Sequence, residues 1–144
     1  MTTVKQLLQT KSSDVWTISP DASVKDALER MAEKNVGALL VVESEELVGI
    51  ISERDYARCS LRKEAVLMTT PVREIMTTRV IYVRPEQTIE ACMALMTDKR
   101  VRHLPVLADD QLVGIVSIGD VVKAIISHQE FIIEQLENYI VGSG

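Results

Sequence analysis

The chain repeats itself, and this repeat constrains the fold more than any other feature of the sequence. When the sequence is shifted by 65 residues, residues 15–55 align with residues 80–120 without a gap, and 13 of the 41 pairs are identical. A repeat of this length is one supersecondary unit, which cannot bury its apolar face alone. We therefore expect the two copies to pack against each other as one compact body.

Each copy has the pattern of a β-α-β-β-α unit. Apolar residues three and four positions apart indicate helices, and β-branched runs on either side of a polar turn indicate hairpins. The elements predicted for the first copy are a strand at 15–18, a helix after Ser23, strands at 38–42 and 47–51, and a helix from Ser52 to about residue 62. Those predicted for the second copy are a strand at 80–83, a helix through residues 89–96, and strands at 103–107 and 112–116.

A short apolar segment leads into each copy. These lead-ins are Val-Lys-Gln-Leu-Leu from residue 4 and Val-Arg-Glu-Ile-Met from residue 72, and an insertion around residues 11–14 separates the first from its copy. The pattern predicts one domain over residues 1–66, a second over 67–127, and a helical extension over 128–144. The apolar stripe of the extension runs to Gly142 and suits a partner helix, although the helix could instead fold back over its own domain.

Composition narrows the class of protein. The formal net charge is −5 and the isoelectric point is about 5.1, whereas a nucleic-acid-binding surface needs a basic balance. Cys59 and Cys92 have no metal-ligand spacing and fit a reducing compartment. No apolar run approaches a membrane span, and the N-terminus has no signal-peptide core. The sequence predicts a cytoplasmic protein without nucleic acid, membrane or bound metal as partners.

The end of each copy carries the residues of most chemical interest. A β-branched strand runs into Ser52 in one copy and Ser117 in the other, and Asp55 or Asp120 follows three residues later. A helix that starts at such a serine leaves backbone N–H groups for a phosphate, and the aspartate could bind ribose hydroxyls. The same spacing also fits a capping box. Both interpretations stay open from the spacing alone.

Three marks make the chain resemble a tandem pair of cystathionine-β-synthase (CBS) domains, a Bateman module. They are the β-α-β-β-α repeat, the Gly-Ile-hydrophobic-Ser-x-x-Asp ending of each copy, and the segments Asn-Val-Gly-Ala-Leu from residue 35 and Arg-Val-Arg-His-Leu-Pro from residue 100. Within the family the chain is similar to small stand-alone prokaryotic CBS-pair proteins. The resemblance implies an α/β (α+β) fold, in which two repeats pack through their sheets with pseudo-twofold symmetry, and a homodimer.

The resemblance also implies two adenosine-binding clefts between the repeats. AMP is the first candidate ligand, and ATP, ADP, NAD(H) and S-adenosylmethionine are others. Each strand end would supply an aspartate for the ribose, a serine for phosphate and an isoleucine for adenine. These residues are Asp55, Ser52 and Ile50 for one cleft, and Asp120, Ser117 and Ile115 for the other.

Because of the pseudo-symmetry, each cleft would combine residues from both copies. Backbone groups that read the adenine edge would come from the opposite copy to the aspartate. These would be Val101, Arg102 and His103 in the Asp55 cleft, and Val36, Gly37 and Ala38 in the Asp120 cleft.

Basic residues near the clefts are candidates for binding phosphate. Arg54 and Arg102 have a fork of donors that matches phosphate and stays charged. The alternative is surface salt bridges of small value, but a basic group beside each cleft of an acidic protein favours phosphate. His103 could bind phosphate or have a structural role. Gly119 stands in the second copy where Arg54 stands in the first, so the two clefts are not expected to be equivalent.

The sequence thus predicts a regulatory protein that binds an adenosine nucleotide to sense energy or redox state, acting on an unknown downstream protein. An enzyme is not expected, because His103 and His128 are the only histidines and neither has a nucleophile or metal ligand at a useful spacing. The alternative is an interaction module with vestigial clefts, which acts through assembly of its C-terminal helix.

Overall fold

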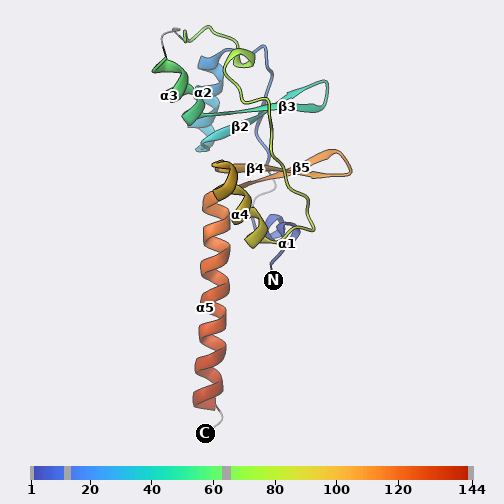
Figure 1. The fold of residues 1–144 in the computed structure, drawn as a ribbon, viewed down its shortest axis with the longest axis vertical. Helices are drawn as coiled ribbons and strands as arrows, with labels where there is room; N and C mark the ends of the chain where they lie inside the picture. The colour runs from blue at the N-terminus through green and yellow to red at the C-terminus, as the bar shows by residue number, and fades with distance from the viewer. Residues whose placement is uncertain (1, 12–13, 63–65, 143–144) are drawn as a thin grey trace.

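The computed structural model describes residues 2–11, 14–62 and 66–142. Figure 1 shows two halves, one for each copy of the repeat, with a long helix that projects from the second half. The first half contains β1 (Thr17–Ile18), α2 (Val24–Lys34), β2 (Ala38–Glu43), β3 (Glu46–Ser52) and α3 (Glu53–Ser60). The second half contains α4 (Ile89–Lys99), β4 (His103–Ala108), β5 (Gln111–Ser117) and α5 (Ile118–Gly142). The lead-ins form α1 (Val4–Thr10) and the 3-10 turn η1 (Val72–Glu74). This arrangement of helices and strands confirms the predicted α/β (α+β) fold class.

The helices α2 and α4 begin and end in the same way. Ser23 and Thr88 are their N-caps, and each side chain accepts a hydrogen bond from the third backbone N–H of its helix, at 3.0 and 3.1 Å. Both helices are followed by a residue in the left-handed conformation, Asn35 and Arg100, each with φ of 55°. These matched caps fix where each chain segment leaves its helix and enters the next strand.

The two hairpins are the predicted ones and share one register. Leu40 of β2 lies opposite Ile50 of β3, and the residues 65 positions later form the corresponding pair in β4 and β5. Each hairpin turns through two residues with positive φ, Ser44 and Glu45 in the first and Asp109 and Asp110 in the second. Positive φ at both central residues is the type I′ turn, whose twist matches that of paired strands.

The predicted strand at residues 80–83 is wrong, because only Val83 forms an isolated parallel bridge to β4. In the first half the corresponding strand β1 pairs with β2, and the Leu40 N–H donates to the Trp16 carbonyl at 3.2 Å. Pro105 stands at the position of Leu40 and has no N–H to donate. The second sheet lacks this bond and is reduced to β4 and β5.

Each lead-in packs into the half formed by the other copy. Val4 and Leu7 of α1 are buried in the core of the second half, whereas Val72 and Ile75 are buried in the core of the first half. Backbone bonds support the exchange, among them the one from the Val4 N–H to the Gln87 carbonyl at 2.8 Å. Neither core is complete without residues from the other side of the predicted boundary at residue 66.

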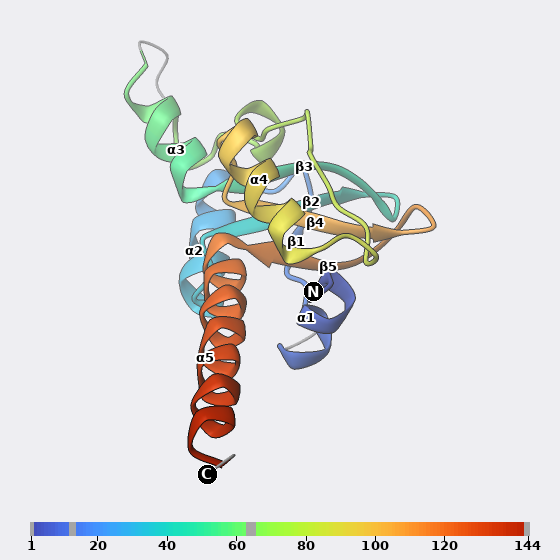
Figure 2. The same cartoon turned by 60° about the horizontal axis from the view of Figure 1, so that its bottom comes forward.

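The helix α5 continues without a break for 25 residues. Val121 in its first turn is buried in the second core, and the helix then extends away from both sheets in Figures 1 and 2. It does not fold back over its own half. Its large exposed apolar side chains are Ile118, Val122, Ile126, Phe131, Ile132, Ile133, Leu136, Tyr139 and Ile140.

Over the described residues, no helix combines the length and the apolar character that crossing a membrane requires.

We expect alanine at Gly49 to destabilise the fold more than alanine at Gly114. A Cβ at Gly49 would lie 2.9 Å from the backbone carbonyl oxygen of Thr77, whereas a Cβ at Gly114 would first meet the Leu8 side chain, at 2.8 Å. The Leu8 side chain can rotate away from the added methyl group, whereas the backbone of Thr77 cannot, because it forms a β-bridge. Gly49→Ala should therefore lower the free energy of unfolding by about 1–3 kcal/mol, and Gly114→Ala by less. Urea unfolding of both variants measures the difference, and equal losses would contradict this packing.

Candidate functional site

Ser52 caps α3, and Asp55 lies in the first turn of that helix. The Asp55 N–H donates to Ser52 Oγ at 3.1 Å, and the Ser52 N–H donates to Asp55 Oδ2 at 2.9 Å. Ser117 and Asp120 repeat both bonds at the start of α5, at 3.1 and 2.9 Å. The capping-box interpretation is confirmed at both strand ends. Each capping box uses Oδ2 of its aspartate, and Oδ1 lies outside the box. A residue of a capping box can therefore also bind a ligand through its carboxylate.

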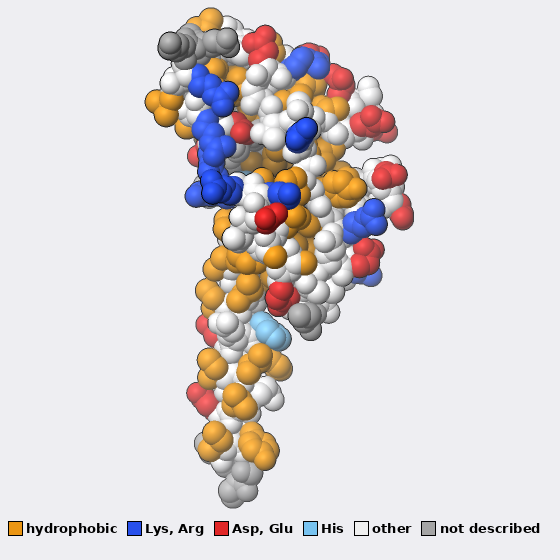
Figure 3. Space-filling model, in the orientation of Figure 1, with side chains coloured by type: hydrophobic (Ala, Val, Ile, Leu, Met, Phe, Trp, Pro, Cys, Tyr) orange, Lys and Arg blue, Asp and Glu red, His pale blue; other side chains and the backbone are white. Residues whose placement is uncertain are grey.

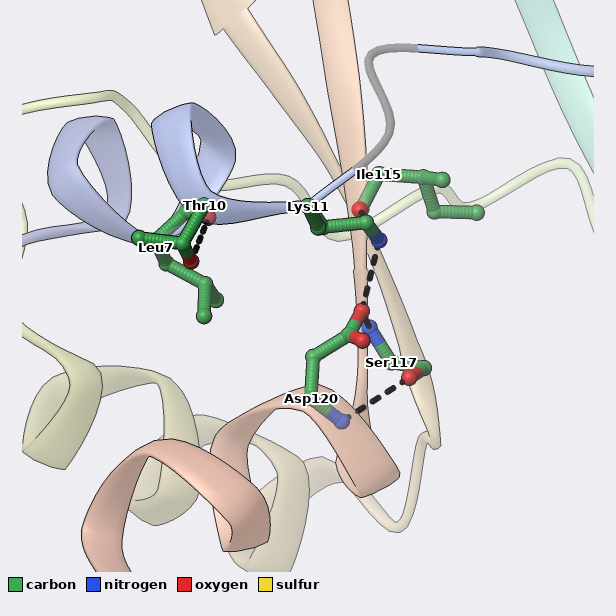
Figure 4. A network of polar contacts seen from close by, with 6 residues as sticks. All are labelled: Leu7, Thr10, Lys11, Ile115, Ser117 and Asp120. Atoms are coloured by element: carbon green, nitrogen blue, oxygen red, sulfur yellow. Dashed lines mark hydrogen bonds and ion pairs between the residues drawn. The ribbon is translucent and has the colours of Figure 1, made fainter. Parts of the chain in front are cut away.

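The two aspartates differ in their next partner. Thr77 Oγ1 lies 3.2 Å from Asp55 Oδ1, where its hydroxyl donates a hydrogen bond. Lys11 Nζ lies 2.7 Å from Asp120 Oδ2 and also donates to the Ile115 carbonyl at 2.8 Å, as Figure 4 shows. A ribose hydroxyl can replace a threonine hydroxyl on a carboxylate, whereas replacing an ammonium group breaks an ion pair. The two strand ends therefore present different surfaces to a ligand.

The surroundings of Asp120 shift its acidity. Burial acts to raise the pKa of Asp120, but the hydrogen bonds from Lys11 and Ser117 outweigh it, and the pKa lies below its ordinary value. Asp120 is therefore ionised at neutral pH. Its contribution to stability is present above the unfolded-state pKa and is lost as the pH falls through the lower folded-state value.

A cavity of about 880 Å³ lies on the Asp55 side, with walls from both halves. It brings together eight of the residues predicted from the sequence: Gly37, Ile50, Ser52, Arg54, Asp55, Val101, Arg102 and His103. The last three come from the second half and meet the aspartate of the first. This is the crossed-over placement expected from pseudo-symmetry, and their part in binding a ligand stays a prediction.

The segment before β2 lies differently from expectation. Gly37 was expected beside Asp120 but lines the Asp55 cavity, where a Cβ would lie 3.8 Å from the ring of His103. Its carbonyl accepts a hydrogen bond from the Glu53 N–H at 3.1 Å. Val36 packs against the first core, and Ala38 is buried in β2. Only Gly37 of these three predicted residues lines the cavity.

The residues predicted for the second cleft are gathered around a side chain of the protein itself. Figure 4 shows Ile115, Ser117 and Asp120 close to Lys11, with Lys11 bonded to Ile115 and Asp120. Gly119 lies next to Ser117, where a Cβ would be 3.7 Å from Ser117 Oγ, and it lines a groove along the first turns of α5. The two strand ends are thus not equivalent in the structure, as the exchange of Arg54 for Gly119 suggested.

The Asp55 cavity is strongly basic. Six Lys and Arg side chains line it, against the two carboxylates of Glu53 and Asp55, and Figure 3 shows basic side chains gathered where the halves meet. The six are Arg54, Arg58, Arg79, Lys99, Arg100 and Arg102. Charges of one sign around a cleft concentrate the field there and attract oppositely charged ligands. Although the protein as a whole is acidic, this cavity therefore favours an anion.

Sequence reasoning missed four of these cations and Thr77. Arg58 could have been found, because it follows Arg54 by four residues and so lies on the same face of α3. Arg79, Lys99 and Arg100 come from segments that only the tertiary fold brings to α3. No local pattern marks them as a group.

His103 lines the cavity from the start of β4. Burial is the main cause that lowers its pKa, while Asp120 acts to raise it and Arg102 and Lys11 act to lower it. The ring is therefore neutral at neutral pH and can both donate and accept a hydrogen bond. A phosphate beside it would favour the protonated form.

The cavity offers binding chemistry of three kinds. The Asp55 carboxylate can accept hydrogen bonds from hydroxyls, the cations can hold an anion, and Ile50, Ile81 and Val101 give an apolar surface for a flat ring. Among the residues that the structure describes, no group of three or more His, Cys, Asp and Glu side chains could hold a metal ion.

Comparisons with known proteins place both copies in one family. The family model for the CBS domain matches residues 4–62 and 72–127. A mitochondrial CBS domain-containing protein of Arabidopsis thaliana, CBSX3, is 40% identical over an aligned region of 151 residues. The match covers 98% of this chain and 73% of that protein.

Solved structures have the same fold. A protein with CBS domains from Burkholderia ambifaria is 48% identical with a TM-score of 0.85, and the match covers 89% of this chain and 96% of that one. The CBS domain pair of protein MJ0100, solved in complex with 5′-methylthioadenosine and S-adenosyl-L-methionine, is 25% identical with a TM-score of 0.78. That match covers 89% of this chain and 98% of the other.

Proposed function

The chain belongs to the CBS domain family as a tandem pair, and from this premise we propose that it is a regulatory protein that binds an adenosine ligand in the Asp55 cavity. The supporting observation is that one cavity combines Asp55 from the first half with Val101 and His103 from the second and with the basic cluster. A ligand there contacts both halves. It can therefore favour one arrangement of them over another, which is the physical basis of regulation. No catalytic step is part of this role.

The residues of the cavity suggest how the ligand lies. The ribose hydroxyls donate to Asp55, where they take the place of the Thr77 hydroxyl that now occupies Oδ1 at 3.2 Å. Adenine lies between the apolar side chains of Ile50 and Val101, which come from opposite halves. The phosphates then extend toward the arginines of α3.

The charge of the cavity favours an adenosine ligand with phosphates. S-adenosylmethionine carries a positively charged sulfonium group, which six Lys and Arg side chains repel. AMP, ADP, ATP and NAD(H) carry the complementary charge. Because six cations exceed what one phosphate needs, we infer that ATP and ADP bind more tightly than AMP. A difference between ATP and AMP would make the protein responsive to energy state, to the extent of its differential affinity for two conformations.

We expect Asp55→Ala to weaken ATP binding at least about tenfold, the effect of losing a charge-assisted hydrogen bond of about 1.5–3 kcal/mol. Isothermal titration calorimetry with ATP, ADP, AMP and S-adenosylmethionine measures the affinities and their order. Asp26→Ala is the matched control, because Asp26 also stands third in a helix capped by a serine but lies outside the cavity. The control should change Kd less than about twofold. An unchanged Kd for Asp55→Ala together with a lower melting temperature would leave Asp55 with a capping role only.

We also infer that α5 assembles the protein into a homodimer, which favours the second candidate function, an interaction module. One stripe of α5 has residues spaced alternately by four and three positions, the spacing of a coiled-coil seam. These residues are Val122, Ile126, Gln129, Ile133, Leu136 and Ile140, of which all but Gln129 are apolar. All five apolar members are 40% or more exposed. The acidic residues of the helix lie off this stripe, so two copies can meet without like charges in contact. A second copy is therefore a fitting partner.

A pair of full-length variants tests this assembly. Leu136→Asp should convert the dimer to a monomer, since it places a charge in the stripe. Phe131→Asp should leave the dimer intact, because Phe131 has nearly the same exposure, 58% against 57%, but faces away from the stripe. Light scattering after size-exclusion chromatography measures the mass. A monomeric unmodified protein, or equal effects of the two changes, would contradict the inference. ATP affinity measured on the same samples shows whether binding and assembly are separate.

A further inference from the structure

The Lys11 side chain, from the insertion after the first lead-in, contacts two of the predicted ligand residues. Its ammonium group lies 2.7 Å from Asp120 Oδ2 and 2.8 Å from the Ile115 carbonyl oxygen. The Lys11 and Asp120 side chains are each 26% exposed, so solvent screens the pair only in part. Lys11 thus contacts two of the three strand-end residues that the resemblance assigns to the second cleft.

The other lead-in shows what is unusual about this contact. The lead-ins align with a shift of 68 residues, so that Leu8 corresponds to Met76, and Leu8 approaches Gly114 as Met76 approaches Gly49. By the same shift Lys11 corresponds to Arg79. Arg79 lines the Asp55 cavity, and among the described residues it has no ion pair to a carboxylate.

We propose that Lys11 is an internal occupant of the Asp120 cleft, which keeps ribose hydroxyls from Asp120 until the lysine side chain leaves. This inference rests on the proposed function and extends it, because it takes Asp120 to belong to a second adenosine site, as the resemblance implies. The protein then binds nucleotide in two steps. The Asp55 cavity fills first, and the Asp120 cleft fills at higher concentration, after its ion pair has broken.

Both the ion pair and the anchoring of α1 support this latch. Breaking a partly buried ion pair leaves a carboxylate without its counter-charge, unless the incoming ligand replaces both hydrogen bonds. Val4 and Leu7 anchor α1 in the second core, so its C-cap residue Lys11 is held near Asp120. Only the lysine side chain has to move for the cleft to open. Its release does not require α1 to leave the core.

The test is the number and affinity of ATP sites, measured by isothermal titration calorimetry on the full chain. Unmodified protein should show one tight site and a second at least about tenfold weaker. Lys11→Ala should tighten the second site about tenfold and leave the first unchanged. Adding Asp120→Ala to Lys11→Ala should weaken that second site again. Lys5→Ala is the control, because Lys5 is an exposed lysine of the same helix and should change neither site.

The outcomes separate this inference from the proposed function. If ATP binds at the first site, but Lys11→Ala neither tightens a second, weaker site nor exposes one, the latch is wrong and the function stands. Two equal sites in the unmodified protein would also overturn the latch. If neither protein binds any adenosine nucleotide, both the function and the latch are rejected. A double variant, Lys11→Ala with Asp55→Ala, should retain binding through Asp120 alone.

Discussion

The exchange of lead-ins between the two halves is the constraint on which the rest of the structure depends. Because Val4 and Leu7 complete the second core and Val72 and Ile75 complete the first, neither half can bury its apolar residues without the other. The same exchange brings Thr77, which follows η1, to Asp55. Hydrophobic burial therefore fixes the position of polar groups at the boundary between the halves, where a ligand can contact both.

Pseudo-symmetry places equivalent residues at two clefts, and small differences in sequence then give them different properties. On the Asp55 side, six basic side chains surround an open cavity. On the Asp120 side, Gly119 replaces an arginine and Lys11 forms an ion pair with the aspartate. A duplicated fold thus supplies one site that is ready for an anion and one that the chain itself occupies. If both strand ends bind adenosine ligands, as we propose, this difference would let the two sites respond at different concentrations.

Features that follow from local pattern could be predicted, and so could the crossed-over placement of Val101 and His103 beside Asp55, which follows from the repeat. Other contacts between distant residues could not. The hairpins and the Ser52 capping box follow from alternation and spacing within about ten residues. The strand at residues 80–83 has a suitable apolar pattern but fails because Pro105, on the neighbouring strand, lacks an N–H. Lys11 and Asp120 are 109 residues apart, so their ion pair could be seen only in the folded chain. The exchange of lead-ins was likewise invisible to periodicity.

The most direct test of the proposed site is a crystal structure of the protein grown with ATP. We expect nucleotide in the cavity between the halves, with the ribose hydroxyls on Asp55, adenine between Ile50 and Val101, and the phosphates among the arginines of α3. At low nucleotide concentration, Lys11 should still be paired with Asp120. Nucleotide bound outside this cavity, or an empty cavity in crystals of protein that binds ATP in solution, would show that the Asp55 cavity is not the nucleotide site.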